Sequence, residues 1–191
     1  MRQIISTLII ATSLCVAIST VHATEAALPK QALVPGGVAI IELDAKQSIP
    51  PKVQYLGHRA LVMKSPTKLN TWITVIGIPL STPPGTQRIE VTTNNQQTSK
   101  TFIVKTKKYP TEKLKITDQR KVTPSPQDYE TIAAQYLETV NTYAAWQESQ
   151  LDSLTLALPV KGRKSSPFGL TRIMNNIPKD PHSGLDIAAP L

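Results

Sequence analysis

His182 and Asp186 are the residues of this chain whose types and spacing could do metal chemistry. They lie four positions apart, in a segment that also contains Pro181 and Gly184. Imidazole and carboxylate groups both bind zinc, and a catalytic zinc site takes three protein ligands and keeps one position open for water. The pair therefore predicts two of the three ligands, and a third is not found among the 191 residues. A His-x-x-x-Asp pair by itself is a pattern that chance often supplies.

The backbone between His182 and Asp186 must bend if both side chains are to bind one ion. In a helix, residues four apart are neighbours, but Pro181 and Gly184 argue against a helix here. In a straight strand the two α-carbons would lie about 13 Å apart, whereas both ligand atoms must come within about 2 Å of the metal. We therefore expect a bent loop that leads into a strand, with Gly184 as the residue that permits the bend.

The first 23 residues have the pattern of a secretory signal peptide. Met1-Arg2 is a short positive start, an apolar run follows from Ile4 to Ile18, and Val21-His22-Ala23 resembles a cleavage site. The apolar run is shorter than the ~20 residues of a membrane-spanning helix. Cys15 is the only cysteine and leaves with the signal, so the mature chain relies on core packing or metal and not on disulfides. We expect export to the periplasm or cell envelope, with no stable membrane span after cleavage.

The composition is that of a globular protein with a basic bias. The formal net charge is +8, and the chain has 16 prolines against 8 glycines. An exported basic protein tends to meet anionic partners such as cell-wall polymers or membrane surfaces. Nucleic acid is the least expected of these partners outside the cytoplasm. A basic surface that only maintains solubility explains the charge equally well.

Residues 34–106 read as several short strands separated by turns, which is typical of a small β-sandwich. Val38–Leu43 and Thr71–Leu80 are rich in β-branched residues, and two later stretches alternate polar and apolar side chains. Gly57-His58 separates two short runs in the manner of a hairpin, so His58 is interpreted as a surface turn residue and not as a metal ligand. The two alternating stretches are Gln87–Thr92 and Lys100–Lys105.

A basic connector and a helix are expected next. Residues 105–121 contain seven lysines and arginines, a pattern that favours a solvated linker over a contact surface for an acidic polymer. Ser125 can cap a helix that has Pro126 at its first position and Asp128 three residues after the cap. Its apolar residues recur at helical spacing to near Ser149, which predicts a face packed on a neighbouring domain; a sugar-stacking platform is the alternative. Beyond it, Leu154–Val160 reads as a strand and Ile173–Asp180 as an irregular loop.

Two regions of the chain together resemble a known family. Ser165–Arg172 followed by His182–Pro190 is similar to the opening of the lysostaphin/LytM-like zinc metalloendopeptidases, which cut peptidoglycan cross-links. Upstream stretches resemble the amino-terminal β-domain that precedes the catalytic domain in a bacterial branch of that family. These stretches are Val34–Ala39, Val75–Ser81, Pro84–Thr86 and Lys108–Pro110.

The resemblance implies a fold, a cofactor and a site. It implies a mainly β protein that binds Zn²⁺ through His182 and Asp186 and has peptidoglycan as its partner. The family's third ligand and its catalytic histidines, including a His-x-His pair, have no counterpart here, so no catalytic residue is assigned to this chain and it is expected to be inactive alone. The expected organisation is a signal peptide (1–23), a β-sandwich domain with the basic connector (24–120), a linking amphipathic helix (121–152) and the incomplete start of a β-rich peptidase domain (153–191).

Three functions remain open at this level. The first is the amino-terminal portion of an exported zinc endopeptidase that acts on peptidoglycan. The second is a non-catalytic protein that binds the cell wall or regulates a wall hydrolase, since degenerate relatives of the family activate other hydrolases. The third is the non-functional product of a fragmentary gene. Retention of both His182 and Asp186 favours the first, because a non-catalytic relative has no chemical need for them.

Overall fold

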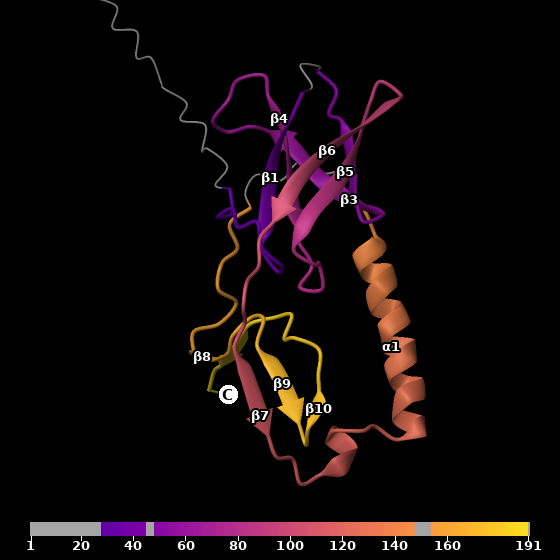
Figure 1. Ribbon diagram of the computed structural model, residues 1–191, viewed down its shortest axis with the longest axis vertical. Helices are drawn as coiled ribbons and strands as arrows, with labels where there is room; N and C mark the ends of the chain where they lie inside the picture. Colours follow the sequence, from indigo (N-terminus) through magenta and orange to yellow (C-terminus); the bar gives the residue numbers. More distant parts are fainter. Residues whose placement is uncertain (1–27, 45–47, 148–153, 191) are drawn as a thin grey trace, which may run out of the picture.

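The computed structural model describes residues 28–44, 48–147 and 154–190 of the chain. The stretch interpreted as a signal peptide and the predicted helix end at Ser149 lie outside these residues. Among the described residues, no helix is both long and apolar enough to cross a membrane. Over these described residues the protein is mainly β with one α-helix, as predicted (Figure 1).

The amino-terminal strands form one antiparallel sheet in the order β1-β4-β3-β2-β5-β6. The expected small sandwich therefore takes the form of a single six-stranded sheet that curls around its core. Its two ends are tied by Lys105, whose backbone N–H donates to the Leu33 carbonyl, and by the Lys100 ammonium, which donates to the Glu42 carbonyl. The strands are β1 (Val38–Leu43), β2 (Lys52–Tyr55), β3 (His58–Lys64), β4 (Trp72–Gly77), β5 (Gly85–Thr93) and β6 (Gln96–Val104).

The core of this sheet is filled by side chains that point to its inner face. Ile89 and Val91 are buried on β5 while Arg88 and Glu90 are exposed, which is the alternation expected of a strand with one buried face. The tight hairpins are made by residues with positive φ: Leu56 and Gly57 between β2 and β3, and Asn94 and Asn95 between β5 and β6. Two consecutive residues of this kind are typical of the type I′ turn, whose twist matches that of the flanking strands.

The carboxy-terminal part contains two small sheets. One has the order β10-β9-β7 and the other pairs β11 with β8. β7 pairs with β9 in parallel, and Figure 1 shows this unit below the curled sheet. The strands are β7 (Thr111–Leu114), β8 (Arg163–Ser166), β9 (Thr171–Met174), β10 (Ile177–Pro178) and β11 (Asp186–Ala188).

Three local expectations for these regions were wrong. The stretch predicted as a basic connector contains β7, which is a strand of the carboxy-terminal sheet. Residues 154–160 form no strand, and Leu156 is 92% exposed. The predicted irregular loop after Ile173 is the β9–β10 hairpin, whose turn is formed by Asn175 and Asn176, both with positive φ.

The helix α1 (Pro126–Ala144) begins as predicted, with Ser125 as its cap. The Asp128 amide donates to the Ser125 hydroxyl, and the Asp128 carboxylate accepts from the Ser125 amide, which completes a capping box. The guanidinium of Arg120, from the short 3₁₀ helix η1 (Gln119–Lys121), donates two hydrogen bonds to the same carboxylate. These bonds from Arg120 and from Ser125 hold the pKa of Asp128 well below its usual range.

Acidification should weaken the start of α1 only below about pH 4. Because the pKa of Asp128 is lower in the folded than in the unfolded chain, its stabilising contribution is complete above the ordinary carboxyl value of about 4 and disappears as the pH falls through the depressed folded value. We expect a constant helical circular dichroism signal down to about pH 4, a decline below it, and a lower, flatter curve for Asp128→Asn. Glu138→Gln, on the same helix but away from the cap, is the control. An identical curve for Asp128→Asn and the wild-type chain would contradict the prediction.

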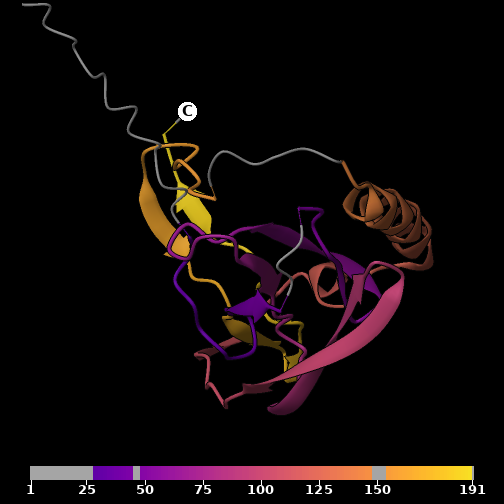
Figure 2. The ribbon, with the colours of Figure 1, turned by 90° about the horizontal axis from the view of Figure 1, so that it is seen from above.

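The apolar face of α1 is not packed on any of the three sheets described, contrary to expectation. No residue of the helix is buried, and in two perpendicular views the helix stands clear of the sheets (Figures 1 and 2). It ends at Ala144, where Ala145 adopts an extended conformation. The exposed apolar side chains are Tyr129, Ile132, Tyr136, Leu137, Val140 and Tyr143.

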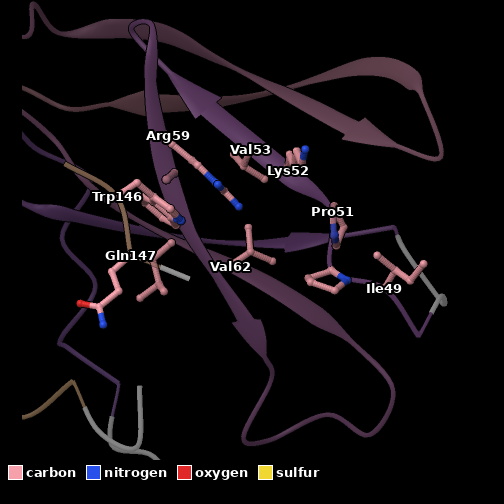
Figure 3. Close-up of a pocket in the computed structure, with 11 residues that line it drawn as sticks. Ile49, Pro51, Lys52, Val53, Arg59, Val62, Trp146 and Gln147 are labelled. Carbon is pink, nitrogen blue, oxygen red and sulfur yellow. The ribbon is translucent and has the colours of Figure 1, made fainter. Parts of the chain in front are cut away.

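Just beyond α1, the chain touches the curled sheet through Trp146. The Arg59 guanidinium of β3 lies 4.4 Å from the centroid of the indole ring, a cation–π arrangement. Trp146 and Gln147 line a shallow pocket together with Ile49, Pro51 and residues of β2 and β3 (Figure 3). The helix is therefore anchored at both ends, by the Arg120–Asp128 pair and by Trp146, and not along its length.

Candidate metal centre

The two predicted ligands are positioned by β8, β11 and the segment between them. Asp186 opens β11, and its pairing partner on β8 is Ser166. A register shift between Asp186 and Ile187 marks an irregularity of the ladder at this point. Such irregularities re-aim a side chain, and they are common beside functional sites.

His182 is held against the turn that follows β8. Its backbone N–H donates to the Leu170 carbonyl over 2.9 Å, and its own carbonyl accepts from the Gly169 amide over 2.7 Å. These two bonds fold the chain back so that His182 and Asp186 face each other. The residue with positive φ here is Gly169, at +82°, and Gly184 does not adopt such a conformation. The chain does bend at Gly184, as expected, but without the positive φ that glycine readily adopts.

The side chains of His182 and Asp186 converge on one point. The imidazole Nε2 lies 3.2 Å from the Asp186 Oδ1, with the two side chains 20% and 53% exposed. Two ligands about 2.1 Å from a tetrahedral zinc ion stand roughly 3.4 Å apart. The separation therefore fits an edge of such a site, and the exposure leaves the pair accessible from solvent.

The hydrogen bonds of the other ring nitrogen, Nδ1, determine the tautomer of His182 and so whether Nε2 presents a lone pair to Asp186. Nδ1 lies 3.1 Å from the Pro167 carbonyl and 3.2 Å from the Ser166 hydroxyl. Because a carbonyl only accepts, the bond to Pro167 requires a hydrogen on Nδ1, and in the neutral ring this leaves a lone pair on Nε2. A lone pair beside a carboxylate is favourable only with a cation or a proton between them. The arrangement is compatible with a metal ion bound at Nε2 and equally with a proton shared between Nε2 and Asp186, while the protein holds the second ring nitrogen.

Ser166 and Arg172 support His182, and the sequence alone did not identify them. The Arg172 guanidinium donates to the Ser166 hydroxyl over 2.8 Å and lies 3.6 Å from the Glu112 carboxylate of β7. Glu112 and Arg172 are direct partners in the parallel β7–β9 pairing. The run Ser-Pro-Phe-Gly-x-x-Arg could have indicated this contact. Its proline and glycine predict a turn between Ser166 and Arg172, which brings the two residues close together.

The described residues provide two ligands and no more. No group of three or more His, Cys, Asp or Glu side chains within residues 28–44, 48–147 and 154–190 is arranged to hold a metal ion. His58 begins β3 beside the Leu56-Gly57 turn and is exposed, in the curled sheet and not at this site. A complete three-ligand zinc site therefore needs one further ligand from outside this set.

Residues 31–107 match the family model of the peptidase family M23 N-terminal domain. The chain resembles M23 peptidases that carry this domain. The matched span contains all six strands of the curled sheet, so this sheet corresponds to the M23 N-terminal domain. This confirms the predicted resemblance to lysostaphin/LytM-like peptidases with an amino-terminal β-domain.

A solved structure of a candidate M23 peptidase from Pseudomonas aeruginosa is similar over most of the chain. The two share 33% sequence identity with a TM-score of 0.63, and the match covers 84% of this chain. It covers 57% of the Pseudomonas protein, so this chain spans little more than half the length of that relative. No curated protein matches the chain.

Proposed function

We propose that this chain is the amino-terminal portion of an exported zinc metalloendopeptidase that hydrolyses peptide cross-links of bacterial peptidoglycan. The observation that carries the proposal is the convergence of His182 Nε2 and Asp186 Oδ1, which lie 3.2 Å apart. Both residues follow, in the sequence, a span that matches the M23 N-terminal domain. The share of the Pseudomonas relative that this chain spans is consistent with a third ligand in a further part of the protein.

The residues of the chain have distinct tasks in this proposal. His182 offers the Nε2 lone pair and Asp186 a negative charge, while Pro167 and Ser166 fix the ring through Nδ1. Arg172 holds the Ser166 hydroxyl and is itself oriented by Glu112. A zinc ion bound there would polarise the scissile carbonyl and lower the pKa of its water to about 7.

The charge and the amino-terminal pattern support an envelope substrate. The net charge of +8 suits a polyanionic cell wall, and residues 1–23 have the features of a signal peptide. The M23 N-terminal domain would then be carried across the inner membrane with the peptidase.

Removal of zinc should abolish activity reversibly. The measurement is a zymogram with isolated peptidoglycan and the protein extended through a complete peptidase domain. We expect clearing that disappears with a strong chelator and returns on addition of zinc, because the metal both polarises the carbonyl and activates water. Clearing that survives chelation would overturn the proposal. Binding of the protein to peptidoglycan without any clearing, with zinc present, would favour the non-catalytic alternative.

A further inference from the structure

Tyr109 lies between the M23 N-terminal domain and the turn after β8, which holds the backbone of His182. It belongs to the segment between β6 and β7, and its hydroxyl donates to the Pro35 carbonyl over 2.7 Å. Its ring meets the Phe168 ring edge to face, with centroids 6.2 Å apart and an interplanar angle of 73°. Pro35 belongs to the amino-terminal domain and Phe168 to the turn after β8, so one side chain touches both parts.

Two glycines make room for this side chain. A Cβ atom added to Gly169 would lie 2.1 Å from the Tyr109 ring. A Cβ atom added to Gly36 would lie 2.8 Å from the Tyr109 hydroxyl and 2.6 Å from the Phe168 ring. Both glycines also have positive φ, at +82° and +72°, which side chains disfavour. The turn at Gly36 and the turn at Gly169 therefore close on Tyr109 from its two sides.

The turn that receives the Tyr109 ring also holds His182. The Gly169 amide donates to the His182 carbonyl, and the next carbonyl, that of Leu170, accepts from the His182 amide. The neighbour of Tyr109 adds a further bond, because the Pro110 carbonyl accepts from the Thr171 amide over 3.0 Å. The backbone of His182 is thus hydrogen-bonded to the same short turn on which the Tyr109 ring packs.

We infer that Tyr109 is a positioning residue that couples the M23 N-terminal domain to the His182 loop. Tyr109 holds the turn at Gly169 against the turn at Pro35–Gly36. The turn at Gly169 then fixes the backbone of His182 through two hydrogen bonds. The consequence for zinc rests on the proposed function, whereas the mechanical coupling does not. The amino-terminal domain is then part of the support of the metal ligand and not only a module that precedes the peptidase.

Hydrogen exchange of the metal-free chain tests the coupling. In Tyr109→Ala we expect the amides of Gly169 and His182 to exchange more than about tenfold faster, because the turn loses its packing and the bond to Pro35. Tyr109→Phe removes only the hydroxyl and should give a smaller acceleration, about threefold to tenfold, as for the loss of one hydrogen bond. Unchanged exchange at both amides in a folded Tyr109→Ala chain would overturn the inference.

Two control variants separate coupling from general loosening. Tyr55→Phe removes a hydroxyl that bonds to Gln87 inside the curled sheet, and Tyr136→Ala removes an exposed ring from α1. Neither should change the exchange of Gly169 and His182. Should Tyr109→Ala fail to fold, Tyr109→Phe decides alone, and exchange equal to that of Tyr55→Phe would overturn the inference.

Zinc affinity, measured by competition with a chromophoric chelator, separates this inference from the proposed function. Tyr109→Ala should weaken zinc binding about tenfold, the size typical for loss of a group that orients a ligand. If His182→Ala leaves zinc affinity unchanged, the proposed metal site fails, and the exchange measurement still decides the coupling. If His182→Ala abolishes binding and Tyr109→Ala leaves both affinity and exchange unchanged, the metal site stands and the coupling is wrong.

Discussion

Replacing His182 by alanine is expected to lower zinc affinity by more than about 100-fold and to abolish hydrolysis of peptidoglycan. Losing a group that only orients a ligand costs about 10- to 100-fold, and losing the ligand itself costs more. Nε2 lies 3.2 Å from Asp186 Oδ1, so without the ring the carboxylate faces an empty position. Asp186→Asn, which keeps the shape of the side chain but not its charge, should act in the same direction.

His58→Ala is the matched control for the histidine. His58 is exposed at the start of β3 and pairs with Tyr55 across a tight hairpin, away from the candidate metal centre. Its replacement should change neither zinc affinity nor clearing in a zymogram. Equal losses in the His58 and His182 variants would indicate unfolding, and full activity of His182→Ala would remove the metal site altogether.

Replacing Ile89 by alanine is expected to lower the free energy of unfolding of the M23 N-terminal domain by about 2–5 kcal/mol. Ile89 is 0% exposed and is the largest of the fully buried side chains. The loss combines the transfer free energy of the deleted methyl and methylene groups with the cost of the cavity, because a curled sheet closes only partly around a gap. For a domain of ordinary stability this is a large fraction of the total.

Urea denaturation with Ile103→Ala as control measures this effect. Ile103 is on the neighbouring strand β6 but is 63% exposed, so its replacement should cost less than about 1 kcal/mol. We expect the midpoint to fall for the Ile89 variant while the slope m is retained. Similar midpoints for the two variants would show that Ile89 does not occupy a well-packed core.

Local features of this fold could be predicted because they depend only on residues that are close together in the sequence. The alternation along Gln87–Thr92 predicts one buried face, and the structure buries Ile89 and Val91 there. The order Ser125, Pro126, Asp128 predicts a helix start, and the capping box is present. The His-x-x-x-Asp spacing likewise predicted a pair that needs a bend, and the structure brings Nε2 and Oδ1 together.

Features that join distant residues could not be predicted in this way. Thr111–Leu114 has a charged, unremarkable sequence and becomes a strand only because β9 supplies its hydrogen bonds. Leu154–Val160 has an apolar, strand-like sequence but forms no strand in the structure. The contacts that position His182 also join residues that are apart in the sequence. Arg172 donates to Ser166 across a turn, and Tyr109 contacts both Pro35 and Phe168.

The parallel pairing of β7 with β9 also orders events during synthesis. β7 leaves the ribosome soon after the curled sheet is complete, but its partner β9 follows only after the whole of α1. Closing so long a loop is entropically costly and slow, so the curled sheet should form first and β7 should wait with an unpaired edge. Charged side chains at Glu112 and Lys113 discourage wrong pairing of such an edge. The carboxy-terminal sheet then assembles on an amino-terminal domain that is already folded.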